Sequence, residues 1–136
     1  MRVFADLGAW RAARRALTGT VGFVPTMGAL HRGHAALIER CRADCDHAVL
    51  SIYVNPTQFN NPQDLEHYPR TLETDLALAA ELGVDCVVTP DYAQLYPDGF
   101  RYRVEENDFS TQLCGAHRPG HFTGVLTVVM KLLNLV

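Results

Sequence analysis

Short apolar runs alternate with amphipathic stretches between residues 21 and 89. The runs at 21–24, 48–54 and 86–89 carry almost no charge, which is typical of parallel strands buried on both faces. The stretches between them, at 34–45 and 71–82, place apolar residues at helical spacing. This order predicts an α/β fold in which right-handed crossovers build a Rossmann-like parallel sheet with flanking helices.

Turn residues divide the remainder of the chain. Residues 3–17 predict an amphipathic helix, and Thr71 and Gly83 predict the two ends of the helix between them. The segment 55–68 is punctuated by prolines and predicts a long loop, a feature that is often functional. The other expectations are a turn-rich segment at 92–99, a strand at 100–105, a short helix at 109–114, a loop at 118–124 and a strongly apolar segment at 125–136.

Composition narrows the class of protein. The 136 residues suffice for one domain with a core, and no run of about 18 apolar residues predicts a membrane span. A formal charge of −3 argues against a general nucleic-acid surface. Lys131 is the only lysine, so a few local donors must hold any anionic ligand. The amphipathic N-terminus does not resemble a signal peptide, although its arginines leave a mitochondrial presequence as an alternative.

The four cysteines predict reduced thiols. Cys41 and Cys45 would lie one helical turn apart, and no second pair follows at the spacing of a zinc site. Scattered thiols of this kind are usual in a cytoplasmic protein, which is the location we expect.

The first candidate chemistry follows the run at 21–24. Open parallel sheets bind ligands beyond the carboxyl ends of their strands, and the segment 26–34 lies at that position. Gly28 and Gly33 permit close approach, the start of the next helix offers bare amides to phosphate, and His31 and His34 supply hydrogen-bond donors. The spacing fits neither a dinucleotide fingerprint nor a Walker loop. Two surface histidines, or two of the ligands of a metal site, are the alternatives.

Several longer motifs carry a closer resemblance. They are PTMGALHRGH (25–34), SIYVNPTQF (51–59), YPRT (68–71), YPDG (96–99) and RPGHFTGVLTVVMKLLN (118–134). Together, in this order, they resemble the pantothenate synthetase family over residues 20 to 136. The H-x-G-H motif alone would indicate only the wider nucleotidyltransferase superfamily.

The resemblance implies an activity. Members of this family are ATP-dependent ligases in which the pantoate carboxylate attacks the α-phosphorus of ATP, giving pantoyl adenylate and pyrophosphate. The amine of β-alanine then attacks the acyl carbon and expels AMP. The implied small-molecule partners are ATP with bound Mg²⁺, pantoate and β-alanine, with neither nucleic acid nor membrane. A homodimer is the implied assembly.

The resemblance also implies roles for residues of this sequence. His34 and His31 would contact phosphates and be catalytic, with His34 stabilising charge on the phosphoryl group under attack. The ATP-binding segment would be Met27, Gly28, Ala29, Leu30, His31, Arg32, Gly33 and His34. The pantoate and β-alanine site would comprise Gln58, Thr26, Met27, Asn55, Val125, Val128 and Val129. Weaker candidates are Tyr68, Arg118 and His121. No residue is assigned to a metal.

Parts of the family pattern are missing. Full-length members continue into GEKD-like and MSSRN-like segments that contact ATP, and neither occurs here. We therefore expect residues 1–136 to be an N-terminal Rossmann-like ATP- and pantoate-binding domain, truncated, without the family's C-terminal domain and inactive alone. Another nucleotidyltransferase of the superfamily, or a non-catalytic binding module that reuses the fold, are the alternative interpretations.

Overall fold

The computed structural model describes all residues, 1–136, and the chain divides into two compact units. The sheet unit contains residues 1–54, 69–91 and 135–136, and the helical unit contains residues 55–68 and 92–134. No helix in either one has the length and apolar character that crossing a bilayer requires.

The sheet unit confirms the predicted parallel sheet. Its four strands stand in the order β1-β4-β3-β2, and every neighbouring pair is parallel. The strands are β1 (Arg2–Phe4), β2 (Val21–Thr26), β3 (His47–Ile52) and β4 (Cys86–Val88). The helices are α1 (Leu7–Ala16), α2 (Arg32–Asp44) and α4 (Leu72–Glu81). The predicted crossovers at 34–45 and 71–82 are thus present, with ends displaced by one or two residues.

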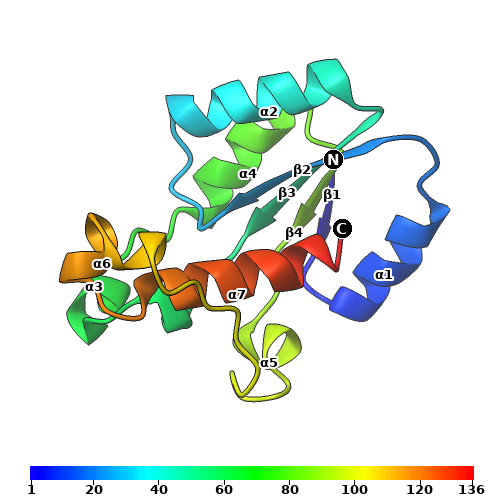
Figure 1. Cartoon of the computed structure of the whole chain (residues 1–136). Coiled ribbons are helices and arrows are strands. Elements are labelled where there is room, and N and C mark those ends of the chain that lie inside the picture. Colours follow the sequence, from blue (N-terminus) through cyan, green and yellow to red (C-terminus); the bar gives the residue numbers. More distant parts are fainter. The chain divides into compact units, whose positions relative to one another are not determined.

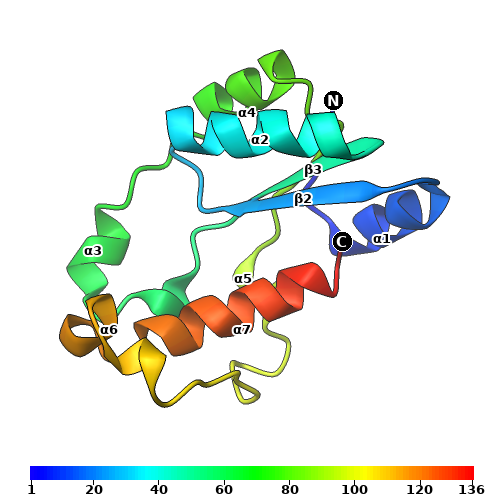
Figure 2. The same cartoon turned by 45° about the horizontal axis from the view of Figure 1, so that its top comes forward.

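The helices cover the two faces of this sheet. The chain moves from β2 to β3 to β4 in one direction across the sheet, so right-handed crossovers place α2 and α4 on one face (Figure 1). The return from β1 to β2 runs the other way and places α1 on the opposite face (Figure 2). The core on the α2 side is formed by Val24, Ile38, Leu50, Ala79, Val84 and Val87.

Strand β2 forms one edge of the sheet. It pairs with β3 from Val21 opposite His47 to Thr26 opposite Ile52. The Thr26 carbonyl accepts from the Tyr53 amide at 3.0 Å, so the neighbouring Pro25, which is exposed, has its ring nitrogen on the outer side. The missing amide hydrogen of the proline therefore leaves the β2–β3 ladder intact.

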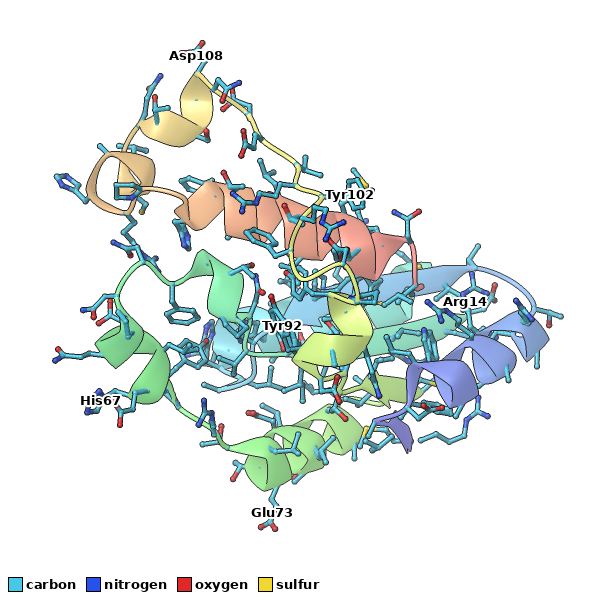
Figure 3. All side chains as sticks on the ribbon, turned by 90° about the horizontal axis from the view of Figure 1, so that it is seen from below. Arg14, His67, Glu73, Tyr92, Tyr102 and Asp108 are labelled. Atoms are coloured by element: carbon cyan, nitrogen blue, oxygen red, sulfur yellow. The ribbon has the colours of Figure 1, made fainter.

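The N-terminal helix prediction was wrong at its start. Residues 2–4 form the edge strand β1, and the side chain of Asp6 then caps α1 by accepting from the Ala9 amide at 2.6 Å. The indole of Trp10 is fully buried and donates to the carbonyl of Leu135 at 2.8 Å. Arg14, labelled in Figure 3, donates to the carbonyl of Val136. Both acceptors belong to the sheet unit.

The helical unit consists of short elements around one long helix. These are η1 (Pro56–Gln58), α3 (Pro62–Glu66), α5 (Tyr92–Leu95), η2 (Phe109–Thr111), α6 (Cys114–His117) and α7 (His121–Leu133). The predicted loop at 55–68 therefore contains two helical turns, and the loop predicted at 118–124 already includes the start of α7. The short helix expected at 109–114 is the 3₁₀ turn η2, with α6 beginning at Cys114.

The strand expected at 100–105 is absent. Apolar and polar residues alternate there, but Phe100 has a left-handed φ of 62°, which interrupts an extended chain. The amide of Val104 donates to the Thr127 hydroxyl at 3.0 Å, on α7, and not to a neighbouring strand. Alternation without a pairing partner does not form a strand.

Candidate active site

A tight turn joins β2 to α2 at the carboxyl end of the sheet. Gly28 and Ala29 both have left-handed backbones, with φ of 81° and 50°. A β-carbon on Gly28 would lie 2.9 Å from an oxygen of Asp75, so glycine is required here for two reasons. The turn brings residues 26–34 to the position that the sequence predicts.

The carboxylate of Asp75 holds this turn. It projects from the first turn of α4, is 3% exposed, and accepts from the amides of Ala29 at 2.9 Å and Leu30 at 2.8 Å. The Thr71 hydroxyl adds a third hydrogen bond at 3.1 Å. The amide of Gly28 likewise donates to the Thr26 hydroxyl, at 3.2 Å.

The expectation of bare amides concerned the start of α2, and the amides directly before it, at residues 28–30, are not bare. Their N–H groups already have protein acceptors, supplied in part by a helix 45 residues further along the chain. A phosphate at this place would depend on side-chain donors.

The two histidines cap the first turn of α2. His31 is the N-cap, and its Nδ1 accepts from the Gly33 amide at 3.1 Å. The Nδ1 of His34 accepts from the His31 amide at 3.3 Å. The ring centroids lie 4.0 Å apart, which confirms that the two rings come together on one side of the helix start.

These bonds determine the tautomer of each ring. A neutral imidazole carries one proton, and a ring nitrogen that accepts cannot carry it. Both rings therefore hold the proton on Nε2 and turn Nε2–H away from the backbone of the cap. His31 is exposed and His34 is half-buried. The pair presents two donors at one place.

The environment of His34 keeps that ring neutral. Burial lowers the pKa of His34 below its usual value, the neighbouring His31 lowers the pKa further, and Asp75 opposes both effects. Near pH 7 this ring is thus an uncharged imidazole that donates through Nε2–H.

An open cavity of about 300 Å³ lies beside the turn in the sheet unit. It is lined by residues that follow β2, β3 and β4 and by the start of α4, as expected for a ligand site at the carboxyl edge of a parallel sheet. Met27, Gly28 and Asp75 contribute to its wall, together with Arg70. Sequence analysis missed Arg70 and Asp75 as site residues. The YPRT motif directly before a helix start was the available signal.

The helical unit holds the predicted acid-binding residues. Asn55 is 1% exposed and Gln58, in η1, is 8% exposed. The side-chain nitrogen of Asn55 donates to the side-chain oxygen of Gln58 at 3.1 Å. In addition, the His121 ring donates through Nδ1 to the Gln58 carbonyl at 2.8 Å, since a carbonyl can only accept. Both the side chain and the backbone of Gln58 are therefore held.

Helix α7 contributes the three valines. Val128 is buried, whereas Val125 and Val129 are half-buried. Gly124 allows α7 to approach η1, since a β-carbon there would lie 2.4 Å from the Thr57 carbonyl. The three weaker candidates have different surroundings. His121 bonds to the Gln58 carbonyl, and the Tyr68 ring packs edge-on against Phe59. Arg118 lines a separate polar hollow with Glu105 and Glu106. The predicted residues thus form two groups, one in each unit.

Comparisons with known proteins agree with these motifs. The family model for pantoate-beta-alanine ligase matches residues 1–136. A pantothenate synthetase of Bdellovibrio bacteriovorus is 58% identical over 136 residues, which are 100% of this chain and 53% of that protein.

Solved structures show the same fold. The pantoate-beta-alanine ligase of Francisella tularensis, crystallised with beta-gamma ATP and beta-alanine, matches with a TM-score of 0.96 at 43% identity. The match covers 99% of this chain and 53% of that one. For the pantothenate synthetase of Thermus thermophilus the TM-score is 0.91 at 48% identity, over 100% of this chain and 49% of the other. This chain thus spans about half the length of its relatives, and it belongs to the pantoate–β-alanine ligase family.

Proposed function

We propose that this chain is the part of an ATP-dependent ligase that binds pantoate and the phosphates of ATP, and that the whole protein joins pantoate to β-alanine. The proposal rests on the pair of Nε2–H donors from His31 and His34 at the start of α2, which follows the turn whose residues Met27 and Gly28 line the cavity at the carboxyl edge of the sheet. Membership of the family and the ATP and β-alanine in the Francisella structure support the assignment.

The first step suits two neutral donors. The carboxylate of pantoate is ionised at neutral pH and needs no base, so it attacks the α-phosphorus directly as pyrophosphate departs. Negative charge on the phosphoryl oxygens is stabilised by positioned hydrogen bonds, and His34 and His31 supply these. The amine of β-alanine then attacks the acyl carbon, and AMP leaves.

The hydrogen bonds from the amides of Ala29 and Leu30 to the Asp75 carboxylate, called the Asp75 clamp below, limit the role of this backbone in binding phosphate. Because Ala29 and Leu30 donate to the carboxylate, the segment is held rigid by α4 and its amides are not the phosphate donors. Arg70 in the cavity wall and the exposed Arg32 are the cations that remain for the outer phosphates. This division gives the histidines the role nearest the chemistry.

The pantoate pocket is proposed for the helical unit. Gln58 offers an amide to the hydroxyl and carboxylate groups, and Val125, Val128 and Val129 offer an apolar wall to the two methyl groups of pantoate. Thr26 and Met27 are assigned to the same ligand on the family resemblance. Asn55 is proposed to act by holding Gln58.

Mg²⁺ is proposed to arrive with the substrate. Neither unit gathers three or more His, Cys, Asp or Glu side chains that could hold a metal ion. The phosphates of ATP would hold the ion, and its charge would lower the cost of forming pyrophosphate. We also propose a homodimer and a cytoplasmic location, both on the family resemblance alone.

An exchange assay tests this function. Labelled pyrophosphate should enter ATP only when pantoate is present, and AMP should appear only when β-alanine is added, using the full-length protein. Exchange that depends on a different acid, or on a nucleotide other than ATP, would favour another nucleotidyltransferase. Calorimetry that detects binding of neither ATP nor pantoate would favour a non-catalytic module. Residues 1–136 alone are expected to show no exchange.

A further inference from the structure

A buried polar network surrounds Asn55 in the helical unit. The Tyr96 hydroxyl donates to the side-chain oxygen of Asn55 at 2.9 Å, and the Thr57 hydroxyl donates to the same oxygen at 3.0 Å. The Asn55 nitrogen donates to the Gly124 carbonyl at 3.2 Å and to Gln58 at 3.1 Å. Asn55 thus makes all four of the hydrogen bonds that a primary amide can make.

The chemistry of these partners permits one orientation of the Asn55 amide. The Gly124 carbonyl can only accept, so the nitrogen must face it. The oxygen then faces the two hydroxyls, which can donate. Turning the amide over would set a carbonyl against the Gly124 oxygen, and the two hydroxyls would have to accept instead of donate.

This orientation is passed on to Gln58. Because the nitrogen of Asn55 points at Gln58, the oxygen of the Gln58 amide must be turned toward Asn55. The NH₂ group of Gln58 therefore lies on the side of its amide away from Asn55. The oxygen and the NH₂ group of this amide therefore cannot exchange places while Asn55 is held.

The ring of Tyr96 is itself fixed. It is 2% exposed, stacks on Tyr92 with centroids 4.9 Å apart, and meets the edge of Phe100 at 5.5 Å. The ammonium of Lys131 lies 5.0 Å from its centroid and pairs with Asp98 at 2.9 Å. Burial raises the pKa of Tyr96, so the hydroxyl keeps its proton and remains a donor. Figure 3 shows Tyr92 on α5 in this unit.

We propose that Tyr96 is a positioning residue for acid recognition: through Asn55 it fixes the orientation of the Gln58 amide, whose side-chain oxygen is turned to Asn55. Lys131 and Asp98 hold the ring in place. This inference rests on the proposed function, since it assumes that pantoate is the ligand of Gln58. The YPDG motif that contains Tyr96 and Asp98 thereby gains a role in substrate selection.

The test compares two tyrosines in the full-length protein. Tyr96→Phe removes the hydroxyl and keeps the ring, and we expect the KM for pantoate to rise about 10-fold, the scale of one buried hydrogen bond, while the KM for ATP stays constant. Tyr92→Phe is the matched control, because that ring stacks in the same cluster but its hydroxyl makes no bond to Asn55. It should leave both constants unchanged.

A double-mutant cycle separates positioning from simple support of the fold. If Tyr96 acts through Gln58, Tyr96→Phe should have almost no effect on the KM for pantoate when Gln58 is already alanine. Equal effects in both backgrounds, or equal rises for ATP and pantoate, would overturn the proposal. Thr57→Val, which removes the second donor to the same oxygen, should reproduce the selective rise.

The outcomes also separate the two proposals. Unchanged kinetics for Tyr96→Phe in an active, pantoate-dependent enzyme would remove Tyr96 and leave the function standing. A wild-type protein without pantoate-dependent exchange would remove both. If Tyr96→Phe and Thr57→Val each fail to fold, the network is structural and the positioning role is overturned.

Discussion

The two groups of candidate residues are built in opposite ways. His31 and His34 stand at the start of a helix, one exposed and one half-buried, and each ring uses a single nitrogen to cap the backbone. Asn55 in the helical unit is almost fully buried and uses every donor and acceptor of its amide. The histidines keep one nitrogen each for a ligand, whereas Asn55 keeps nothing.

The difference matches the two ligands that we propose. Phosphate oxygens carry charge and attract any nearby donor, so two rings at an open site suffice, and their placement by a tight turn is the main requirement. An uncharged amide discriminates between ligands only when its oxygen and its NH₂ group cannot exchange places. That requires a buried neighbour whose own donors and acceptors all have partners. In this proposal the accessible histidines provide binding of phosphate, and the buried amides provide selection of the acid.

Removing His34 should produce the largest effect. For His34→Ala we expect adenylate formation to fall by about 10²–10³-fold, the loss that accompanies removal of one transition-state donor. Pantoate-dependent pyrophosphate exchange measures it. His67→Ala is the control, since His67 is an exposed ring that bonds only within α3 (Figure 3). An unchanged first step would take His34 out of the mechanism.

Breaking the clamp tests whether placement by the turn is essential. Asp75→Asn sets an NH₂ group against one of the amides of Ala29 and Leu30, and we expect a loss of about 2 kcal/mol in the free energy of unfolding. The rate of exchange should fall as the loop loses its position. Glu73→Gln on the same helix, an exposed carboxylate, is the control (Figure 3). Equal unfolding curves for the two variants would contradict the clamp.

Gly124→Ala tests the buried residues around Asn55 and Gln58 in the helical unit. The new β-carbon would approach the Thr57 carbonyl and the backbone of Gln58, and such overpacking costs about 1–3 kcal/mol. Denaturant unfolding should show this loss, and binding of pantoate should weaken more than binding of ATP. Gly8→Ala in α1 is the control, since a β-carbon there would meet only side-chain atoms of Asp6 and no backbone atom. A variant as stable as the wild type would show that α7 and η1 are not tightly packed.

A change of pH should give the smallest effect, and we expect it from His34, whose pKa is lowered in the folded protein. The lowered pKa of His34 means that the unfolded chain binds the proton more readily than the folded one. Stability is therefore complete above about pH 6.5 and falls as the pH drops through the folded pKa. Melting temperatures of the wild type and of His34→Gln between pH 7.5 and 5.5 measure it. A difference between them that does not depend on pH would contradict this assignment.

The parallel sheet could be predicted because its information is local. Uncharged runs and helical spacing between 21 and 89 each report on one element, and their order determines the crossovers. Strand β1 was missed because three residues carry no recognisable period. The beginning of α7 was missed because Gly120 and Gly124 look like loop residues, although Gly124 serves a close approach between backbones.

The site residues were predictable only where a motif carries them. The H-x-G-H histidines and Gln58 stand in recognisable motifs, and the structure explains how His31 and His34 come together. The clamp joins amides to a carboxylate 45 residues away, and the Tyr96 network joins residues 41 and 69 positions apart. No local pattern reports which distant acceptor satisfies a given donor, so these contacts appear only in three dimensions.

Pro25 on the outer side of β2 has a consequence for how copies of this chain meet one another. Exposed strand edges invite foreign strands, and uncontrolled addition of strands leads to aggregates. With no hydrogen to donate at that position, a strand arriving at β2 would lose one rung of its ladder beside the end of the strand. The proline thereby weakens the addition of a further strand at this border of the sheet.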